Sequence, residues 1–385
     1  MATLKFLLFI FVLTSSGNLF TSAHTRSCFD CVPISSCETA LNIARRLRDG
    51  TLSNESRQVY SKSICGIHNG MPKVCCSDYS AIPMEVRTTL LRAADSIENE
   101  PTSADAIENH RNVGLLPTSC GDSDVARIVN GKEAKLYELP WMVLIAYNTR
   151  AGTDFRCGGS IINSRYILTA AHCVIANGMY TKIAYARIGE LDYNNEADCQ
   201  GYGNNVICET NIQDIRVEKI IPHENYNEHE ATADIALLRL NETITMYKNA
   251  APICLPLYAD LRDINLDGYN GTVAGWGITE KHSYSSKLMK VQIPIKTGAN
   301  CNSYFNQYTQ KVHIEKTLCA GAIDKDSCDG DSGGPLMVLS DFNGSLRLVQ
   351  YGIVSFGPRT CGSEYPGVYT DVSKYMDWIL DNIKE

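Results

Sequence analysis

The sequence has no excess of positive charge. Its 385 residues contain 35 Lys and Arg against 43 Asp and Glu, which gives a formal net charge of −8. Nucleic acids and anionic membranes attract basic surfaces, so the composition favours neither as a partner. The composition also excludes a disordered or fibrous chain, because 44% of the residues are hydrophobic and only 20% are charged. At about 100–200 residues per domain, this length fits two or three domains.

Long apolar runs are missing beyond residue 23. Residues 1–23 have the pattern of a secretory signal peptide, with Lys5 as the only charge, an unbroken apolar run over 6–13, and small residues at Thr21-Ser22-Ala23. The alternative is a membrane anchor, but the apolar run is too short to span about 30 Å of hydrocarbon. We therefore predict a secreted, extracellular protein. Four Asn-X-Ser/Thr sequons fit that route, and we predict glycosylation at Asn54, Asn241, Asn270 and Asn343.

Cysteine is abundant, and the chain contains 16. A high, even count indicates an oxidising compartment and argues against a reduced cytosolic enzyme. Six cysteines crowd into residues 28–76, a segment too small to bury much core, so three disulfides would stabilise it. The alternative is a zinc site that includes Cys65 and His68, but six clustered thiols in a secreted chain pair more readily than they bind metal.

The pattern of polar and apolar residues changes along the chain. We predict a helix over 38–48, ended by Gly50, and a polar linker from Ser77 to Ser119 with one short helix over 86–97. From Ile128 onward, short apolar runs alternate with clusters of Gly, Asn and Asp, which is typical of an all-β domain. The predicted strands include residues 141–147, 273–276 and 348–356.

The C-terminal segment has a different pattern. Six apolar residues recur there with helical spacing, and Asp371 precedes them as a candidate N-cap. We predict that they share one buried face of a helix: Val372, Tyr375, Met376, Ile379, Leu380 and Ile383.

Three short motifs carry the chemistry. They are Thr-Ala-Ala-His-Cys ending at Cys173, Asp-Ile-Ala-Leu-Leu from Asp234, and Gly-Asp-Ser-Gly-Gly-Pro around Ser332. A serine hydroxyl needs a base to remove its proton, and the base needs a carboxylate to fix its tautomer. Each residue alone is weak, but His, Asp and Ser in this order, with cysteines beside two of them, predict a nucleophilic triad.

The Gly-X-Ser-X-Gly pattern around Ser332 also fits the nucleophile elbow of α/β-hydrolases. That class of enzyme has the order Ser, Asp, His and a sheet wound by helices. Here Ser332 comes last and only one long amphipathic helix follows it. The order therefore favours the triad of the chymotrypsin type.

Residues 128–385 resemble the chymotrypsin-like serine proteases over their whole length. Residues 28–76 resemble a clip domain with its closing Cys75-Cys76 doublet, and the combination is similar to the arthropod clip-domain serine proteases of haemolymph cascades. The resemblance implies an all-β fold of two six-stranded antiparallel barrels with a C-terminal helix. The implied domains are a signal peptide (1–23), a clip domain (24–77), a linker and activation segment (78–127) and a protease domain (128–385).

The same resemblance implies the catalytic roles. His172 is the general base and later the acid, Asp234 orients it, and Ser332 is the nucleophile, while the N–H groups of Gly330 and Ser332 form the oxyanion hole. His172 and Asp234 would come from the first barrel and Ser332 from the second. No cofactor is needed for this chemistry.

Specificity follows from the residues expected around the pocket for the substrate side chain before the scissile bond. Asp326 would lie at its floor, with Gly357 and Gly367 on its walls, so the enzyme would cleave after Arg or Lys. The alternative is that Asp326 is a surface charge. Asp329 adds negative charge near the pocket mouth and would disfavour acidic residues after the scissile bond. The family commonly has Trp where this chain has Phe356, which leaves upstream selectivity open.

Activation is implied by Arg127-Ile128-Val129-Asn130-Gly131. Cleavage after Arg127 would free the Ile128 amine to pair with Asp331, and the activator would be a trypsin-like protease or the protein itself. The alternative is an exposed Arg127 with no role. A calcium loop is implied by the Glu190 and Asp198 carboxylates with the Asp192 and Asn195 carbonyls; its alternative is a solvated acidic loop.

The resemblance also implies a disulfide pattern that uses every cysteine, because spacing alone cannot choose the connectivity. One bridge would keep the clip domain attached after cleavage. The implied pairs are Cys28–Cys75, Cys31–Cys65, Cys37–Cys76, Cys120–Cys254, Cys157–Cys173, Cys199–Cys208, Cys301–Cys319 and Cys328–Cys361.

We expect a trypsin-like zymogen of an extracellular, haemolymph-type cascade in innate immunity, in Toll-type signalling or melanisation. Expected partners are protein substrates with Arg or Lys before the scissile bond, an upstream activating protease and a serpin inhibitor. The alternatives are a catalytically dead homologue that binds partners, a chain in which the clip domain is the functional unit, and a developmental protease. No triad residue is missing, which favours the enzyme.

Overall fold

The chain folds into two compact units, Met1–Glu100 and Pro101–Glu385. This computed structural model describes residues 31–33, 36–37, 40, 63–68, 71–79, 103–122, 132–202, 205–230, 232–278, 284–297, 314–321, 330–357 and 366–385. No described helix combines the length and the apolar character that a membrane crossing requires.

The first unit is a small antiparallel sheet held by disulfides. Its strand order is β1 (Cys31–Pro33), β3 (Met71–Cys75), β2 (Ile64–His68), followed by the 3-10 turn η2 (Cys76–Tyr79). Cys31 is bonded to Cys65 and Cys37 to Cys76, as the resemblance implies. Because its sulfur is in a disulfide, Cys65 is not available as a zinc ligand.

Some expectations for this unit lie outside the described residues. Of the predicted helix over 38–48, only Ala40 is described, and it is helical. The predicted helix over 86–97, Asn54 and Cys28 are not among the described residues. Cys75, the expected partner of Cys28, is disulfide-bonded.

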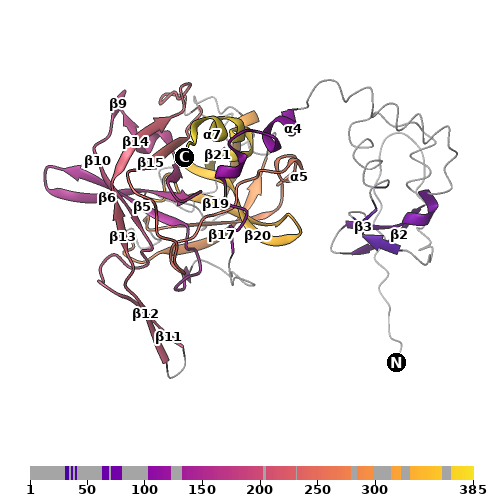
Figure 1. Cartoon of the computed structure of the whole chain (residues 1–385), viewed down its shortest axis with the longest axis horizontal. Coiled ribbons are helices and arrows are strands. Elements are labelled where there is room, and N and C mark those ends of the chain that lie inside the picture. The colour runs from indigo at the N-terminus through magenta and orange to yellow at the C-terminus, as the bar shows by residue number, and fades with distance from the viewer. Residues whose placement is uncertain are drawn as a thin grey trace, which may run out of the picture. The chain divides into compact units, whose positions relative to one another are not determined.

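The second unit is built on two sheets, and the first of them carries the N-terminal half of the protease region (Figure 1). Its neighbouring strands pair antiparallel. The order is β13 (Gln213–Ile215), β10 (Ile183–Ile188), β5 (Met142–Thr149), β6 (Gly152–Ile161), β7 (Tyr166–Thr169), β15 (Ala236–Leu240) and β14 (Val217–Pro222).

The second sheet closes on itself, because β16 pairs with both β19 and β17. Its order is β16 (Asn270–Gly275), β19 (Pro335–Phe342), β20 (Ser345–Phe356), β21 (Gly367–Asp371), β18 (Thr317–Ala320), β17 (Met289–Lys296) and β4 (Lys132–Glu133).

Within the described ranges, each sheet has seven strands where six are expected. In the first sheet, only Arg216 separates β13 from β14, so the two are successive parts of one bent strand. In the second sheet, the extra member is the two-residue strand β4. The two barrel-like sheets therefore confirm the predicted architecture, with one short edge strand added.

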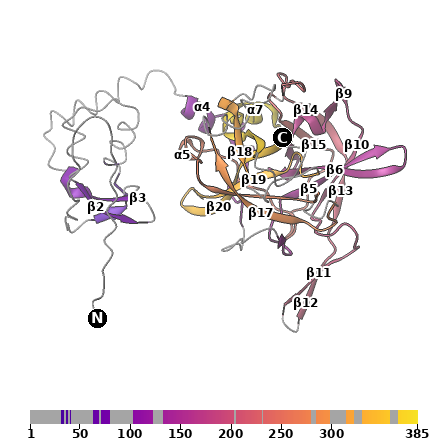
Figure 2. The ribbon, with the colours of Figure 1, turned by 180° about the vertical axis from the view of Figure 1, so that it is seen from behind.

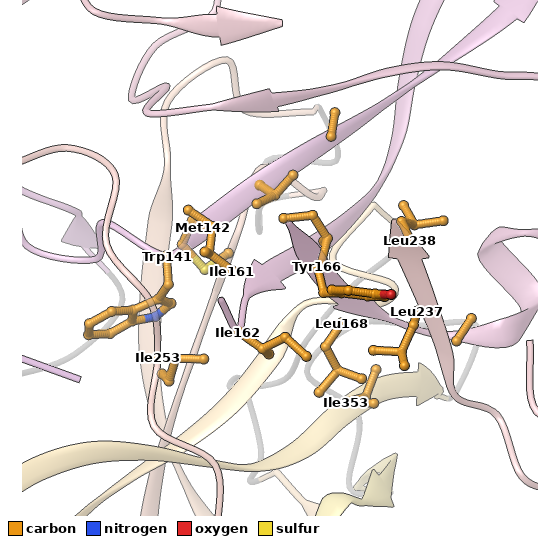
Figure 3. Close-up of a cluster of buried hydrophobic side chains, with 14 of the residues drawn as sticks. Trp141, Met142, Ile161, Ile162, Tyr166, Leu168, Leu237, Leu238, Ile253 and Ile353 are labelled. Carbon is orange, nitrogen blue, oxygen red and sulfur yellow. The ribbon is translucent and has the colours of Figure 1, made fainter. Parts of the chain in front are cut away.

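The core lies within and between the sheets. Apolar side chains of the first sheet gather around Trp141 and Tyr166, and Ile353 of the second sheet lies among them (Figure 3). A second cluster, which includes Tyr351 and Tyr369, fills the other sheet. The predicted runs at 141–147, 273–276 and 348–356 fall largely in β5, β16 and β20.

Helices are short and peripheral. The C-terminal helix α7 (Met376–Asn382) follows the 3-10 turn η6 (Val372–Lys374), and the Asp371 carboxylate accepts a hydrogen bond from Ser373 N at 3.0 Å. All six apolar residues predicted for its inner face are buried. The other helical segments are α4 (Ser103–Glu108), η3 (Val113–Leu115), η4 (Ala171–Cys173), α5 (Ala259–Arg262) and η5 (Ile314–Lys316).

Two small ribbons complete the unit. The ribbon of β11 (Asp198–Tyr202) and β12 (Asn205–Glu209) projects from the body in both views and is crosslinked by Cys199–Cys208 (Figures 1 and 2). The other ribbon joins β8 (Ile175–Ala176) to β9 (Met179–Tyr180). The predicted glycosylation sites Asn241, Asn270 and Asn343 are exposed.

Residues 103–122 differ from the linker expected over 78–127. They belong to the second unit and pack on it: Leu116 lies in its core and Cys120 is bonded to Cys254. Polar side chains of the segment bind backbone groups of the unit, as Asn112 and Glu108 do, and such contacts leave no apolar periodicity in the sequence.

A buried hydrogen bond joins the two sheets. Ser160 Oγ on β6 donates to Gln350 Oε1 on β20 at 2.6 Å, and both side chains are fully buried. Ser160→Ala would leave that oxygen without its donor, so we expect the free energy of unfolding to fall by about 1–3 kcal/mol. Urea unfolding measures the change. The exposed Ser345→Ala is the matched control and should change stability by less than about 0.5 kcal/mol; equal effects would contradict the prediction.

Candidate active site

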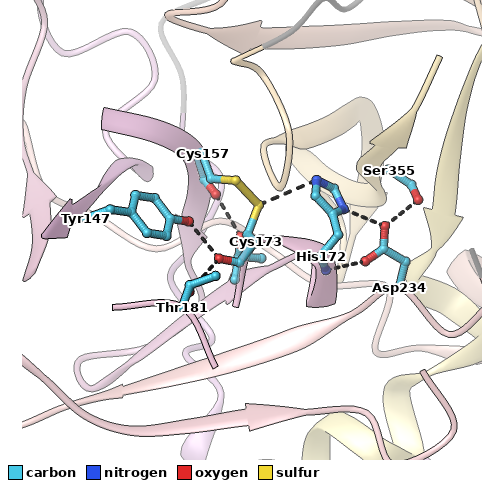
Figure 4. The surroundings of a disulfide bond; sticks show 9 residues. Tyr147, Cys157, His172, Cys173, Thr181, Asp234 and Ser355 are labelled. Atoms are coloured by element: carbon cyan, nitrogen blue, oxygen red, sulfur yellow. Dashed lines mark hydrogen bonds and ion pairs between the residues drawn. A yellow bond between two sulfur atoms is a disulfide. The ribbon is translucent and has the colours of Figure 1, made fainter. Parts of the chain in front are cut away.

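His172 and Asp234 lie together at one end of two neighbouring strands of the first sheet. His172 is in η4, directly after β7, and Asp234 precedes β15, the neighbour of β7. The Nδ1 atom of His172 is 2.8 Å from Asp234 Oδ2, and the backbone N of His172 donates to Oδ1 at 2.9 Å (Figure 4). Because the carboxylate only accepts, Nδ1 carries the proton and Nε2 keeps its lone pair.

The second sheet supplies further donors to Asp234. Ser355 Oγ, near the end of β20, donates to the carboxylate (Figure 4). Thr370 Oγ1 on β21 donates to the Asp234 carbonyl at 2.8 Å. The phenol of Tyr375 hydrogen-bonds the backbone of Ala233, the residue before Asp234. Asp234 is therefore fixed from both sheets and from the start of the C-terminal helix.

Burial and charge oppose each other in this pair. Burial lowers the pKa of His172, but the negative charge and hydrogen bond of Asp234 outweigh it, so the pKa lies above its ordinary value of 6.5. Burial likewise raises the pKa of Asp234, but the imidazole and the hydrogen bonds from His172 and Ser355 hold it below the ordinary range. The carboxylate is thus ionised and ready to stabilise an imidazolium.

Ser332 lies on a glycine turn that leads into β19. Gly333 has φ +78°, and a β-carbon there would collide with Thr169 and Gly158, so only glycine fits. The backbone N of Gly158 donates to Ser332 O at 2.8 Å, which places Ser332 beside β6. Within the described residues, no hydrogen bond joins Ser332 Oγ to His172; such bonds are often formed only with substrate present.

The turn also presents backbone donors. Gly330 has φ +99°, and in the described part of the chain the N–H groups of Gly330 and Ser332 donate to no other protein group. Asp331 points the other way: its carboxylate accepts from Gly277 N at 2.9 Å, and a β-carbon at Gly275 would collide with it. Two N–H groups are thus available beside the hydroxyl of Ser332.

The two glycines predicted for the pocket walls lie at adjacent strand ends. Phe356 on β20 pairs with Val368 on β21, so Gly357 and Gly367 are neighbours just beyond Ser355. Asp326, Asp329, Cys328 and Cys361 lie outside the described residues, and so do Arg127 and Ile128. The pocket floor and the cleavage site therefore remain predictions.

Disulfides flank the site. The Cys157–Cys173 bridge links β6 to the residue after His172, and Cys173 Sγ is 3.7 Å from His172 Nε2 (Figure 4). These two sulfurs and the imidazole are close enough to suit a metal, but the sulfurs are in a disulfide and are not thiolate ligands. Cys319 is also disulfide-bonded, and its expected partner, Cys301, is not among the described residues.

The acidic loop before β11 is compact. Asp198 accepts from Leu191 N at 2.8 Å and from Asp192 N at 2.9 Å, and Asp192 Oδ2 accepts from Asn195 Nδ2 at 2.6 Å. Glu190 and Asp198 are both buried. Burial, with the charge of Asp198 added, raises the pKa of Glu190 to about 7. Burial also raises the pKa of Asp198.

Family profiles match both parts of the chain. The profile described as Trypsin matches residues 128–379, and that described as the regulatory CLIP domain of proteinases matches residues 30–76. The chain therefore belongs to the trypsin family of serine proteases, in the group that carries an N-terminal CLIP domain.

Curated relatives match nearly the whole chain. "Serine protease grass" of Drosophila melanogaster is 33% identical and the match covers 92% of this chain and 88% of the relative. "Phenoloxidase-activating factor 1" of Holotrichia diomphalia is 34% identical and the match covers 98% of each chain. The crystal structure of the Drosophila Grass clip serine protease of the Toll pathway is similar with a TM-score of 0.60 at 32% identity, over 91% of this chain and 93% of that one.

Three hydroxyl side chains that hold Asp234 and the residue before it lie outside the triad motifs. Ser355 lies on β20, Thr370 on β21, and Tyr375 at the start of α7. A hydroxyl within an otherwise apolar strand is the signal that was available, since a buried hydroxyl needs a partner.

The opposing effects on His172 can be separated by titration. In Asp234→Asn the charge is gone but burial remains, so we expect the pKa of His172 to fall from above 6.5 to below it. Histidine NMR titration of both proteins measures this. His223 is the internal control, because its pKa is lowered by burial and does not depend on Asp234. A His172 pKa that stays above 6.5 in the variant would contradict the assignment.

Proposed function

We propose that the chain is the secreted zymogen of a trypsin-like endopeptidase, activated by cleavage after Arg127 and specific for Arg or Lys before the scissile bond. The observation that carries this proposal is the ionised, buried Asp234 bonded to His172 beside a glycine turn that presents Ser332. That arrangement suits a base, its orienting carboxylate and a nucleophile.

The reaction uses these groups in order. Ser332 Oγ attacks the scissile carbonyl while His172 Nε2 takes its proton, and Asp234 stabilises the resulting imidazolium. The N–H groups of Gly330 and Ser332 bind the oxyanion. His172 then gives the proton to the leaving amine, and water repeats the sequence to release the acyl group from Ser332.

Regulation and specificity depend on the charged residues of the oxyanion region. We propose that the Ile128 amine, once freed, pairs with Asp331 and holds the turn that carries Gly330. Asp326 would pair with the substrate guanidinium or ammonium between Gly357 and Gly367, and Asp329 would disfavour acidic residues after the scissile bond. Losing one oxyanion donor costs about 10²–10³ in rate, so a mobile turn keeps a zymogen inactive.

The biological setting we propose is an innate-immune cascade. One relative is named as a phenoloxidase-activating factor, and another as a protease of the Toll pathway. The protein would act on a downstream protein with Arg or Lys at the cleaved bond, after activation by a trypsin-like protease, and a serpin would inhibit it. The alternative is a non-catalytic homologue, and the presence of His172, Asp234 and Ser332 in the sequence argues against it.

The activity test uses the full chain and an immobilised trypsin-like protease that cuts after Arg127. We expect the cut protein to hydrolyse Arg and Lys peptide amides but not the Phe analogue, and Asp326→Ser to lose that preference. Cut Ser332→Ala should lose about 10⁶-fold in kcat. Mass spectrometry of the new N-terminus and release of the chromophore are the two measurements.

Arg127→Gln is the activation control. It should stay single-chain and inactive, because no α-amine forms at Ile128. Full activity in that variant would overturn the zymogen mechanism, and hydrolysis that survives in Ser332→Ala would overturn the triad. A correctly cut wild-type chain that hydrolyses no peptide would instead support the non-catalytic alternative.

We also propose a structural calcium ion in the acidic loop. Glu190 and Asp198 are both buried and their pKa values are raised, so the fold holds two carboxylates with too little compensating charge. Arg187 is 3.5 Å from Glu190 but also forms two shorter contacts to Asp214. Oxygen-only donors of this kind suit calcium, which would complete its shell with the Asp192 and Asn195 carbonyls.

The proposed site predicts a pH-dependent stabilisation. Because the folded pKa of Glu190 is about 7 against an ordinary 4.5, ionisation destabilises the fold as pH rises between these values, and a bound cation offsets it. We expect calcium at about 1 mM to raise the melting temperature more at pH 8 than at pH 5, and EDTA to reverse the change. Glu190→Gln should lose the effect, whereas Glu196→Gln, an exposed residue of the same loop, should keep it. No shift at pH 8 would favour the solvated acidic loop.

A further inference from the structure

Residues 103–122, here called the strap, lie before the predicted cleavage site and yet are bound to the catalytic unit. The strap contains α4 and η3 and runs beside α5 and α7 in both views (Figures 1 and 2). It would become the end of the N-terminal chain once the bond after Arg127 is cut. Its contacts therefore decide what holds that chain in the active protein.

The most specific contact of the strap is to the end of the C-terminal helix. Asn112 Nδ2 donates to Leu380 O at 2.8 Å and to Ile383 O at 3.2 Å. Carbonyls in the last turn of a helix have no partner within it, so a side-chain amide here acts as a cap supplied from 268 residues away. His110 adds a contact of 3.1 Å from Nε2 to Asp381 on the same helix.

The rest of the strap binds other parts of the unit. Glu108 Oε1 accepts from Ala259 N at 2.7 Å, and Asn163 Nδ2 donates to Leu115 O at 3.2 Å. Leu116 is 9% exposed and belongs to the core that includes the C-terminal helix. These contacts combine an apolar anchor with directional hydrogen bonds, as specific protein interfaces do.

The disulfide lies at the other end of the strap. Cys120 and Cys254 are both buried, and Gly121 bonds Pro252 and Leu348 through its backbone N and O at 2.9 and 3.0 Å. The non-covalent contacts of residues 108–116 are separate from this bridge in sequence. They would remain if the bridge were absent.

We propose that the strap is a second, non-covalent latch, which keeps the N-terminal chain on the catalytic unit after cleavage even without the Cys120–Cys254 bridge. The proposal rests on cleavage after Arg127, as proposed above. It sets the boundary of the catalytic unit near residue 103 and not at Ile128. After cleavage, the cap of the C-terminal helix would then come from the N-terminal chain, which carries Asn112.

The test removes the bridge with Cys120→Ser and Cys254→Ser in the full chain and cuts after Arg127 with the immobilised protease. Native size exclusion and mass spectrometry then show whether the two chains co-elute. We expect co-elution. Adding Asn112→Ala and Glu108→Ala should weaken retention by about ten-fold for each hydrogen-bonding side chain lost. Arg111→Ala, an exposed residue of the same strap, is the matched control and should not change retention.

Separation of the chains in the bridge-free protein, without any strap substitution, would overturn the proposal. Equal retention in the Asn112→Ala, Glu108→Ala protein and in the Arg111→Ala protein would also overturn it. Both outcomes are read from mass and elution, not from activity. A chain that is cut and retained but hydrolyses nothing would count against the proposed function and leave the latch intact.

If the bridge-free protein does not fold, hydrogen exchange on the disulfide-bonded protein decides the matter. Asn112→Ala should raise exchange in α7 about ten-fold, because its last turn loses two cap bonds, and Arg111→Ala should not. Unchanged exchange in α7 of the Asn112→Ala protein would overturn the proposal.

Discussion

A carboxylate buried between the two sheets sets the geometry of the site. Asp234 is 2% exposed, and a buried charge without partners costs several kcal/mol. Its donors come from both sheets: His172 follows β7 of the first, and Ser355 lies near the end of β20 in the second. The position of the imidazole therefore depends on the packing of one sheet against the other, and a shift of either would leave the charge unpaired.

The backbone directly before Asp234 is strained. Ala233 has φ +50°, a left-handed conformation that costs a residue with a β-carbon about 1–2 kcal/mol. Ile235 N donates to the Ala233 carbonyl at 2.8 Å, and the phenol of Tyr375 hydrogen-bonds the backbone of Ala233. Because Tyr375 begins the C-terminal helix whose far end Asn112 caps, contacts outside the triad help to hold the strained turn before Asp234.

The sequence was informative where the signal is local. His172 and Asp234 lie in short motifs, and the helical face from Val372 to Ile383 follows a simple period, so the contact of this pair and the all-β fold with its last helix could be predicted. The role of Ser332 stays a prediction. Ser355 could not, because its partner is 121 residues away and one hydroxyl in an apolar strand carries little signal. The sequence predicts a linker over the strap for a related reason: Asn112 and Glu108 bind backbone groups, which requires no apolar pattern.

Two buried acidic sites in one unit show how the fold treats negative charge. At Asp234 an imidazole and several donors outweigh burial, and the pKa is lowered; at Glu190 burial prevails, and the pKa is raised to about 7. Both sites are buried, so the difference lies in the compensating charge and donors. Arg187 neutralises the charge of Glu190 only in part, because its two shorter hydrogen bonds go to Asp214. The first site is complete with protein groups alone, whereas the second has the charge and the oxygen donors that would accommodate a divalent cation.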